Sequence, residues 1–168
     1  MRSEERMGIE ALAQAAAEEL GAEVEIKDDM CYLTVAANVD DGEDEYNEVV
    51  SVYGGEEMGG IYVRNTFGYV DDDTDFRGLL GVAADECYAR VYLEEDDEGE
   101  YAVIEAGVPL EGLTAERFAV VIQEVVDSSA SVRAIVPDDD DEDDDDEDED
   151  EDEDDEESED EASDEGES

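Results

Sequence analysis

The sequence predicts an α+β fold in which helices pack on one face of an antiparallel sheet of about five strands, followed by a disordered acidic tail. Apolar residues recur with the 3.6-residue period of a helix at both ends of residues 1–137, and with the two-residue period of a strand between them. After Pro137 the chain becomes almost wholly acidic. The order helix, strands, short helix, hairpin and helix is typical of a sheet that helices cover on one side.

The distribution of charge divides the chain into two parts. Its 168 residues include 60 Asp or Glu and 8 Lys or Arg, which gives a formal charge of -52. Residues 138–168 hold 26 of the acidic residues and no apolar side chain larger than Ala162, so they cannot bury enough surface to offset chain entropy. We therefore expect one folded domain at 1–137, with a net charge of -26, and a disordered Asp/Glu-rich tail at 138–168.

The N-terminal half is expected to form one helix and then a meander of strands. Ser3 can cap the first helix, Gly21 ends it, and alternating apolar residues begin at Val24. An acidic loop is predicted at 40–43, and the Gly54-Gly55 and Gly59-Gly60 pairs are interpreted as flexible connections. The apolar stripe of the helix is Ile9, Leu12, Ala13, Ala16 and Leu20, and the strands are predicted around 24–26, 31–37, 50–52 and 61–69.

The C-terminal half is expected to hold a short helix, a hairpin and a long helix. The acidic run 71–75 offers a start for the short helix, although Gly78 and Gly81 weaken it. A strand follows whose two sides differ, with Cys87, Ala89, Val91 and Leu93 on one and Tyr88, Arg90 and Tyr92 on the other. The turn at 94–100 leads into a strand at 101–108, and Thr114 caps the last helix. The apolar stripe of that helix is Phe118, Val121, Ile122, Val125, Val126 and Ser129.

Part of this half resembles a known family. The segments Phe76-Arg77-Gly78-Leu79-Leu80, 87–93, 101–106 and 108–114, the last opening a long helix, are similar to the YbjN-like family and to its relatives, the type III secretion chaperones. The similarity covers 76–135 and extends to the N-terminal half only by the order of elements. The resemblance implies a secretion-chaperone-like fold and a non-catalytic, dimeric, chaperone-like protein-binding domain; the acidic tail does not belong to the family pattern.

The acidity also predicts the solvent in which the protein works. A domain with a charge of -26 repels itself in dilute buffer, whereas at molar salt the Debye length falls to about 3 Å and the repulsion is screened. We therefore expect a cytoplasmic protein from the salt-filled cytoplasm of a halophilic archaeon. The alternative is a functional acidity, as in a nucleic-acid mimic or a carrier of basic proteins. Salt adaptation predicts acids on all exposed faces, whereas a mimic needs them in a duplex-like array.

Composition excludes several kinds of chemistry. The chain contains no His, which removes Ser-His-Asp and Cys-His mechanisms and His-ligated zinc sites. Cys31 and Cys87 lie in alternating apolar runs and are expected to be buried thiols. The spacing of Glu94, Asp96, Glu98, Gly99 and Glu105 imitates a calcium loop, but its flanks have the period of strands, so a hairpin turn is predicted. We expect no catalytic residue, no metal and no cofactor.

Partners are also constrained. The apolar runs are far shorter than the roughly 20 residues that cross a bilayer, and the N-terminus lacks the apolar stretch of a signal peptide, so no membrane association is expected. The basic residues are scattered, which disfavours binding of nucleic acid. The tail has three interpretations: solubility at high salt, capture of basic proteins or diffuse cations, and competition with nucleic acid for basic sites.

The expected partner is therefore another protein or a second copy of the chain, as a homodimer. Tyrosine supplies a large contact area at little cost in rotamer entropy, and a short helix with two glycines needs packing to persist. Two further hypotheses remain open: a small enzyme or metabolite binder with a carboxylate site, and an acidic decoy for basic proteins. The residues predicted to form the protein or dimer interface are Tyr62, Phe76, Leu79, Leu80, Tyr88, Arg90 and Tyr92.

Overall fold

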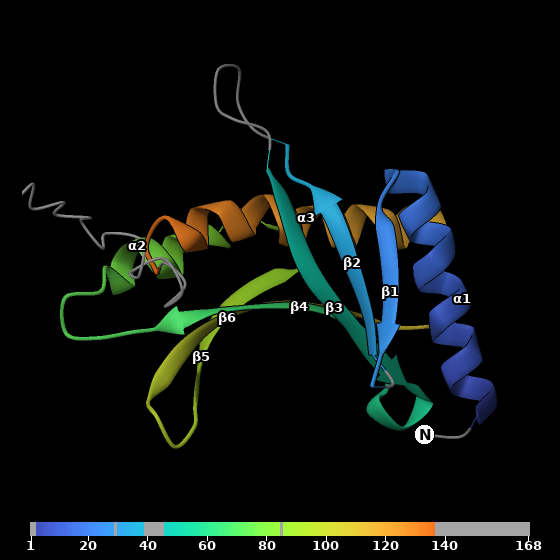
Figure 1. Cartoon of the computed structure of the whole chain (residues 1–168), viewed down its shortest axis with the longest axis horizontal. Helices are drawn as coiled ribbons and strands as arrows, with labels where there is room; N and C mark the ends of the chain where they lie inside the picture. Colours follow the sequence, from blue (N-terminus) through green and yellow to red (C-terminus); the bar gives the residue numbers. More distant parts are fainter. Residues whose placement is uncertain (1–2, 29, 39–45, 85, 137–168) are drawn as a thin grey trace, which may run out of the picture.

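The computed structural model describes residues 3–28, 30–38, 46–84 and 86–136, which form one six-stranded antiparallel sheet and three α-helices (Figure 1). The predicted α+β class is confirmed, with six strands where about five were expected. The loop predicted at 40–43 and the tail predicted at 138–168 lie outside the described residues.

The elements follow one another in the predicted order, including a short helix between the fourth and fifth strands. A single 3₁₀ turn, η1, joins two strands of the meander. The elements are α1 (Ser3–Leu20), β1 (Glu23–Lys27), β2 (Met30–Ala36), β3 (Asn47–Gly55), η1 (Glu56–Met58), β4 (Gly60–Tyr69), α2 (Phe76–Val82), β5 (Ala89–Glu95), β6 (Glu100–Val108) and α3 (Ala115–Arg133).

The strands lie in the order β1-β2-β3-β4-β6-β5, and every neighbouring pair is antiparallel. The first four form the predicted meander. The β5–β6 hairpin then adds to β4 through its second strand, so β1 and β5 become the two edges of the sheet. One row of directly opposed residues consists of Glu25, Tyr32, Ser51, Arg64, Glu105 and Arg90, in that order across all six strands.

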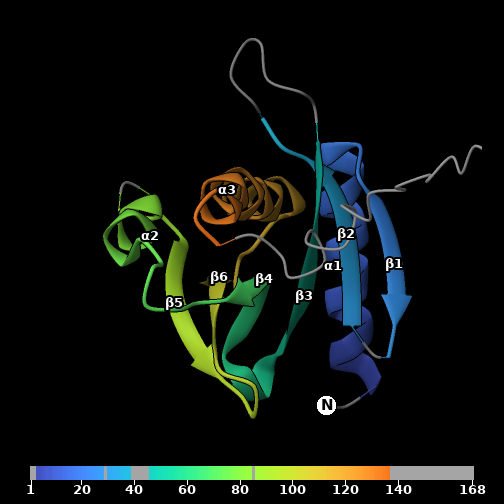
Figure 2. The same ribbon diagram turned by 60° about the vertical axis from the view of Figure 1, so that its left-hand side comes forward.

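The helices pack on one face of the sheet, as predicted. On β2, β3 and β4 every second residue is buried against them, and α3 lies between α1 and α2 (Figure 2). Apolar stripes on α1 and α3 supply the other half of the core. Its largest fully buried apolar side chains include Leu33, Ile61, Ile104, Phe118 and Ile122.

Two polar side chains begin the C-terminal helices. Thr114 accepts a hydrogen bond from the Arg117 amide at 3.3 Å, which confirms the predicted cap of α3. Asp75 accepts one from the Gly78 amide at 2.9 Å and begins α2. A Cβ atom on Gly78 would lie 2.5 Å from the Asp75 carboxylate, so the glycine that weakens this helix also permits its cap.

The Gly54-Gly55 and Gly59-Gly60 pairs bracket the connection between β3 and β4, but only Gly59 lies in that connection, so the predicted flexible role fails for the other three glycines. Gly54 and Gly55 end β3, and Gly55 is directly opposite Gly60 on β4. A Cβ on Gly54 would lie 2.3 Å from the Gly60 carbonyl oxygen, and one on Gly60 would lie 2.5 Å from that of Val108. Close approach between main chains therefore requires glycine at positions 54 and 60, whereas at Gly59 the left-handed φ of 76° favours it.

The prediction of two buried thiols holds only for Cys31. Cys31 is buried on β2, whereas Cys87 is exposed and precedes β5, and no disulfide joins them. The chain departs from the sheet before Ala89 because the Glu124 carboxylate on α3 accepts hydrogen bonds from the Tyr88 and Ala89 amides, at 2.5 and 2.7 Å. The two-residue alternation in the sequence therefore begins at Cys87, two residues before β5 itself begins at Ala89.

An ion pair between a buried carboxylate and a partly exposed guanidinium connects the end of α3 to the sheet. Glu48 on β3 is buried, and Arg133 of α3 donates to its two carboxylate oxygens at 3.0 and 2.7 Å. Asn65 on β4 donates to the same carboxylate at 3.0 Å, and the Arg133 guanidinium lies 5.4 Å from the centre of the Phe67 ring. The carboxylate is thus fully hydrogen-bonded inside the domain, as a buried charge requires.

Candidate functional site

The side of the sheet that faces away from α1, α2 and α3 is rich in tyrosine. We call it the open face. Because side chains alternate along a strand, most apolar residues of each strand turn to the helices and the intervening residues turn to the open face; Val49 and Val103 are apolar residues on the open face. Its polar and aromatic side chains include Tyr32, Ser51, Tyr53, Tyr62, Arg64, Tyr69, Arg90, Tyr92, Glu94, Tyr101 and Glu105.

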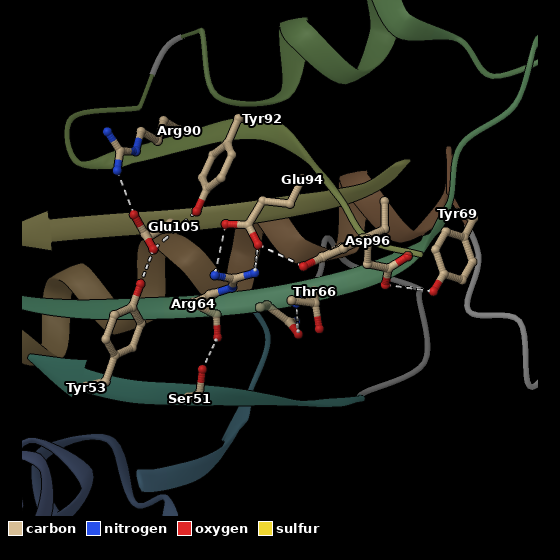
Figure 3. A network of polar contacts seen from close by, with 12 residues as sticks. Ser51, Tyr53, Arg64, Thr66, Tyr69, Arg90, Tyr92, Glu94, Asp96 and Glu105 are labelled. Carbon is tan, nitrogen blue, oxygen red and sulfur yellow. Dashed lines mark hydrogen bonds and ion pairs between the residues drawn. The ribbon is translucent and has the colours of Figure 1, made fainter. Parts of the chain in front are cut away.

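Glu105 lies at the centre of the open face and is only 4% exposed (Figure 3). Arg90 on β5 donates to its Oε1 atom at 2.6 Å. On the other oxygen, Oε2, Glu105 accepts hydrogen bonds from the hydroxyl of Tyr53 on β3 and, at 3.3 Å, from that of Tyr92 on β5. Three donors from two other strands, β3 and β5, thus converge on one carboxylate of β6.

The tyrosines around Glu105 hold their protons strongly. Burial, followed by the negative charge of Glu105, raises the pKa of Tyr92 to about 12. Burial and the hydrogen bond to Glu105 also raise the pKa of Tyr53. The hydrogen bond to Glu105 is the largest influence on Arg90 and raises its pKa. These tyrosines are therefore neutral hydrogen-bond donors, and Arg90 is a cation, at any physiological pH.

A second ion pair lies beside the first. Arg64 on β4 binds Glu94 on β5 with both terminal nitrogens, at 3.1 and 2.5 Å, and Tyr101 on β6 donates to the same carboxylate at 2.8 Å. The hydrogen bonds from Arg64 and then Tyr101 lower the pKa of Glu94. Such bidentate pairs fix geometry as well as charge, because the planar guanidinium matches the carboxylate.

The hairpin between β5 and β6 closes one end of the open face. Asp96 accepts hydrogen bonds from the amides of Glu98 and Gly99 at 2.9 and 3.1 Å, and the Tyr69 hydroxyl lies 3.0 Å from Asp96 and 2.9 Å from Glu98. The hairpin turn predicted in place of a calcium loop is confirmed. Within the described residues, no group of three or more acidic or thiol ligands is arranged to hold a metal ion.

The centre of the open face is electrically balanced, although the whole chain is strongly negative. Arg90 is paired with Glu105 and Arg64 with Glu94, so two cations offset two anions there. The Tyr53 and Tyr62 rings stack beside these pairs with their centres 5.4 Å apart, and the Arg90 guanidinium lies 5.5 Å from the centre of the Tyr92 ring. Neutral aromatic surface thus surrounds two neutralised ion pairs.

The structure separates the predicted interface residues into two groups. Tyr62, Arg90 and Tyr92 lie on the open face, whereas Phe76 and Leu80 are exposed on α2. Leu80 is 72% exposed, but Leu79 is 3% exposed and belongs to the core, so it is not available to a partner. The reason is the helical period, which turns Leu79 towards α3 and leaves Phe76 and Leu80 on the opposite side.

Tyr88, the remaining predicted residue, lies between two shallow grooves. The larger, of about 370 Å³, borders the open face and is lined by Tyr62, Tyr88, Arg90, Pro109 and the backbone of three glycines. The smaller, of about 200 Å³, runs towards α3 and is lined by Tyr88, Pro109, Leu113, Arg117 and Val121, among others. Tyr88 therefore contacts both surfaces without belonging fully to either.

Sequence reasoning missed most of the polar network. Arg64, Glu94, Tyr101 and Glu105 lie in strands or turns that the sequence predicts, but the sequence does not identify them as site residues, and it assigns Tyr53 to no element. The alternation of β3, where Val50 and Val52 face inward, would have assigned Tyr53 to the other side, but its partner Glu105 is 52 positions away. A single sequence contains no signal for that distant pairing.

Comparison with known proteins adds no assignment: the chain matches no family model, no curated protein and no solved structure at a significant level. The resemblance to the YbjN-like family and the type III secretion chaperones therefore stays a prediction. Among the described residues, no helix combines the length and the apolar character that crossing a bilayer requires.

Proposed function

We propose that the protein is a non-catalytic, chaperone-like protein-binding domain that works at high salt, binds a partner protein across its open face and associates with a second copy of itself. The observation that carries this proposal is the open face itself, in which tyrosines surround two ion pairs on the side of the sheet opposite the described helices. Tyrosine is enriched in protein interfaces because it combines a large, rigid apolar surface with a hydrogen-bonding hydroxyl.

The charges around the open face indicate the chemistry of the partner. Its centre is balanced, but its ends are acidic: Glu25 lies on the edge strand β1, and Asp96 and Glu98 lie at the hairpin. A complementary protein surface has an apolar or aromatic centre and basic residues at its margin. At molar salt only charges in direct contact attract, so the apolar centre supplies most of the binding free energy.

The acidic residues outside the open face favour salt adaptation over nucleic-acid mimicry. Exposed carboxylates occur on each side of the domain rather than in one array. They include Glu18 and Glu19 on α1, residues 71–73 before α2, and Glu111 and Glu116 near the start of α3. Scattered acidity is the pattern expected of a protein that stays soluble and folded in concentrated salt.

One observation favours a second candidate function, the binding of a small molecule. The groove of about 370 Å³ contains Arg90, whose side chain is 66% exposed, beside Tyr62 and Tyr88. A guanidinium next to aromatic rings is suited to a planar carboxylate. A metabolite of this type would bind at the same end of the open face as a protein partner. The two functions are therefore distinguished by which ligand, the small carboxylate or the protein, a substituted variant no longer binds.

Site-specific photo-crosslinking tests the proposal. A benzophenone amino acid replaces either Tyr62 on the open face or Val120, an exposed residue of α3, and the protein is irradiated in extract of its source organism at molar KCl. We expect adducts from position 62, with crosslinked peptides that carry apolar residues flanked by Lys or Arg, and few from position 120. Equal labelling from both positions, or none from position 62, contradicts the proposal. If Arg90→Met no longer binds small carboxylates but still gives the protein adducts, the second candidate is supported.

A further inference from the structure

The two edges of the sheet differ in how they are protected. On β1, Glu23, Glu25 and Lys27 are all exposed, and charges of this kind prevent another strand from adding to an edge. On β5, charged residues (Arg90, Glu94 and Glu95) flank the strand, but its centre, unlike the centre of β1 at Glu25, consists of the partly buried apolar or aromatic side chains Val91, Tyr92 and Leu93. The β5 edge is therefore the one that could accept another strand.

The hydrogen-bond pattern of the hairpin shows which backbone groups of β5 point outward. The Asp96 amide donates to the Gly99 carbonyl at 2.9 Å, which makes these two residues a hydrogen-bonded pair. Hydrogen-bonded pairs occur at every second position of an antiparallel ladder, so in β5 the even-numbered residues pair with β6 in this way. The N–H and C=O groups of Val91, Leu93 and Glu95 consequently point away from β6.

The first outward position is already occupied. The Ala89 amide donates to Glu124 of α3, in agreement with this alternation. Glu124 thus ends the available edge on one side, and the hairpin turn ends it on the other. Between them lies a short length of strand centred on Tyr92.

The sequence of that length is self-complementary. It reads Arg90-Val91-Tyr92-Leu93-Glu94, and a two-fold axis through Tyr92 places Arg90 opposite Glu94 of a second copy. The same axis places Val91 opposite Leu93, on the side of the helices, and Tyr92 opposite itself on the open face. Both outward-pointing residues then form hydrogen-bonded pairs, as the backbone pattern requires.

Neighbouring registers lack this complementarity. Because the outward groups occur at every second residue, the pairing can shift only in steps that preserve the alternation. One such shift places Arg90 opposite Tyr92, and the opposite shift places Tyr92 opposite Glu94. The shift that places Tyr92 opposite Glu94 would also set Arg90 opposite Asp96, but Asp96 lies beyond β5 in the hairpin turn. Within the strand itself, only the register centred on Tyr92 brings opposite charges together on both sides of the axis.

We propose that two copies of the chain join edge to edge through β5, antiparallel about a two-fold axis at Tyr92, so that their sheets form one continuous sheet. This inference rests on the self-association in the proposed function and specifies its surface and register. The existing ion pairs extend across the junction: Arg64, Glu94, then Arg90 and Glu105 of the second copy form a line of alternating charge.

The position of α2 agrees with this arrangement. The helix contacts β5 and lies at the β5 edge of the helix layer (Figure 2). Its exposed Phe76 and Leu80 side chains are thus on the side of the sheet where Val91 and Leu93 meet their counterparts. The second copy covers this apolar surface, which a monomer leaves in water.

Disulfide crosslinking measures the register directly. In a Cys87→Ser background, Tyr92→Cys places two thiols opposite each other at a non-hydrogen-bonded pair, where Cα atoms are about 4.5 Å apart, within the range that a disulfide spans. We expect oxidation at molar KCl to convert most of this variant to a covalent dimer. Arg90→Cys alone serves as the matched control, because its two copies are offset by four residues, roughly 13 Å.

A mixture of Arg90→Cys and Glu94→Cys proteins provides the second arm. Each variant alone should remain uncrosslinked, whereas the mixture should form the mixed disulfide dimer. Circular dichroism of the reduced variants establishes that each is folded. Crosslinking of Arg90→Cys alone as efficiently as Tyr92→Cys overturns the register.

Light scattering of the parent at molar KCl separates this inference from the proposed function. A parent dimer that Tyr92→Cys fails to crosslink overturns the β5 junction and leaves self-association intact. A monomeric parent overturns both, while photo-crosslinking from position 62 still reports on the partner that the open face binds.

Discussion

Tyr53 on β3 donates a hydrogen bond to Glu105 on β6, although β4 lies between the two strands. The contact is made above the sheet, where the Tyr53 ring stacks on that of Tyr62 and extends over β4. Glu105 is directly opposite Arg64 on one side and Arg90 on the other, and it pairs with Arg90, while Arg64 pairs with Glu94 across β6. The open face therefore combines one directly opposed ion pair with two contacts, Tyr53–Glu105 and Arg64–Glu94, that each reach over an intervening strand.

These contacts predict how the protein responds to alkali. A phenol whose pKa is raised on folding contributes stability that is present below its ordinary pKa of about 10 and is lost as the pH rises through its folded value. For Tyr92 the folded pKa is about 12, and those of Tyr53, Tyr69 and Tyr101 are also raised. We expect the absorbance of tyrosinate to rise in two stages, the second accompanied by unfolding. Ionisation of all eight tyrosines in one step near pH 10, with the fold intact, contradicts this.

The Arg64–Glu94 pair should make the stability of the domain depend on acidic pH, as the tyrosines do on alkaline pH. Because the pKa of Glu94 is lowered on folding, the pair contributes stability above the ordinary pKa of a glutamate and loses it as the pH falls through the lowered value. Glu94→Gln should therefore unfold at lower urea than the parent at neutral pH, and the difference should shrink below about pH 4. Glu95→Gln, which removes the same charge one residue later, is the control. Parallel pH profiles for Glu94→Gln and the parent would argue against the pair.

Removal of Arg133 should destabilise the domain strongly. In Arg133→Met the Glu48 carboxylate stays buried without its cation, which typically costs about 3 to 5 kcal/mol of unfolding free energy. Urea unfolding at molar KCl measures the loss. In the double variant Glu48→Gln with Arg133→Met, the negative charge of the buried Glu48 carboxylate is also removed, so part of the lost stability should be recovered. If the single variant is as stable as the parent, the ion pair does not fasten α3.

Folding should depend on salt. Screening must suppress repulsion within residues 1–137, whose net charge is -26. Circular dichroism should show a cooperative loss of structure as KCl falls from about 3 M to about 0.1 M, over which the Debye length grows from under 3 Å to about 10 Å. An unchanged spectrum and Tm would remove the argument for salt adaptation and favour the acidic decoy.

Residues 138–168 should be dispensable for folding, because they contain no large apolar side chain with which to dock. Truncation after Pro137 should leave Tm at molar KCl nearly unchanged. A drop of more than several degrees would show that these residues pack against the domain.

Local sequence patterns predicted the helices and strands, whereas burial and ion pairs that depend on contacts between distant segments could not be predicted from them. The helical period of α3 and its Thr114 cap, and the alternation on β4, depend on neighbours within a few residues, so they were readable. Leu79 and Cys87 were misassigned because their burial depends on where α3 lies. The ion pairs of the open face could not be predicted either, because they depend on the order of strands in the sheet. Arg64 on β4 and Glu94 on β5 are close only because both strands pair with β6.

The link between Glu48 and Arg133 has a consequence for synthesis on the ribosome. Strands β1 to β4 are made first, but their inner face has only α1 to cover it until α3 arrives at the end of the domain. Contacts between residues so far apart in the chain form late, because a long loop must close before they are gained. The inner face of the nascent sheet is thus only partly covered, and open to contact with other chains, for most of translation, until the last helix docks on it.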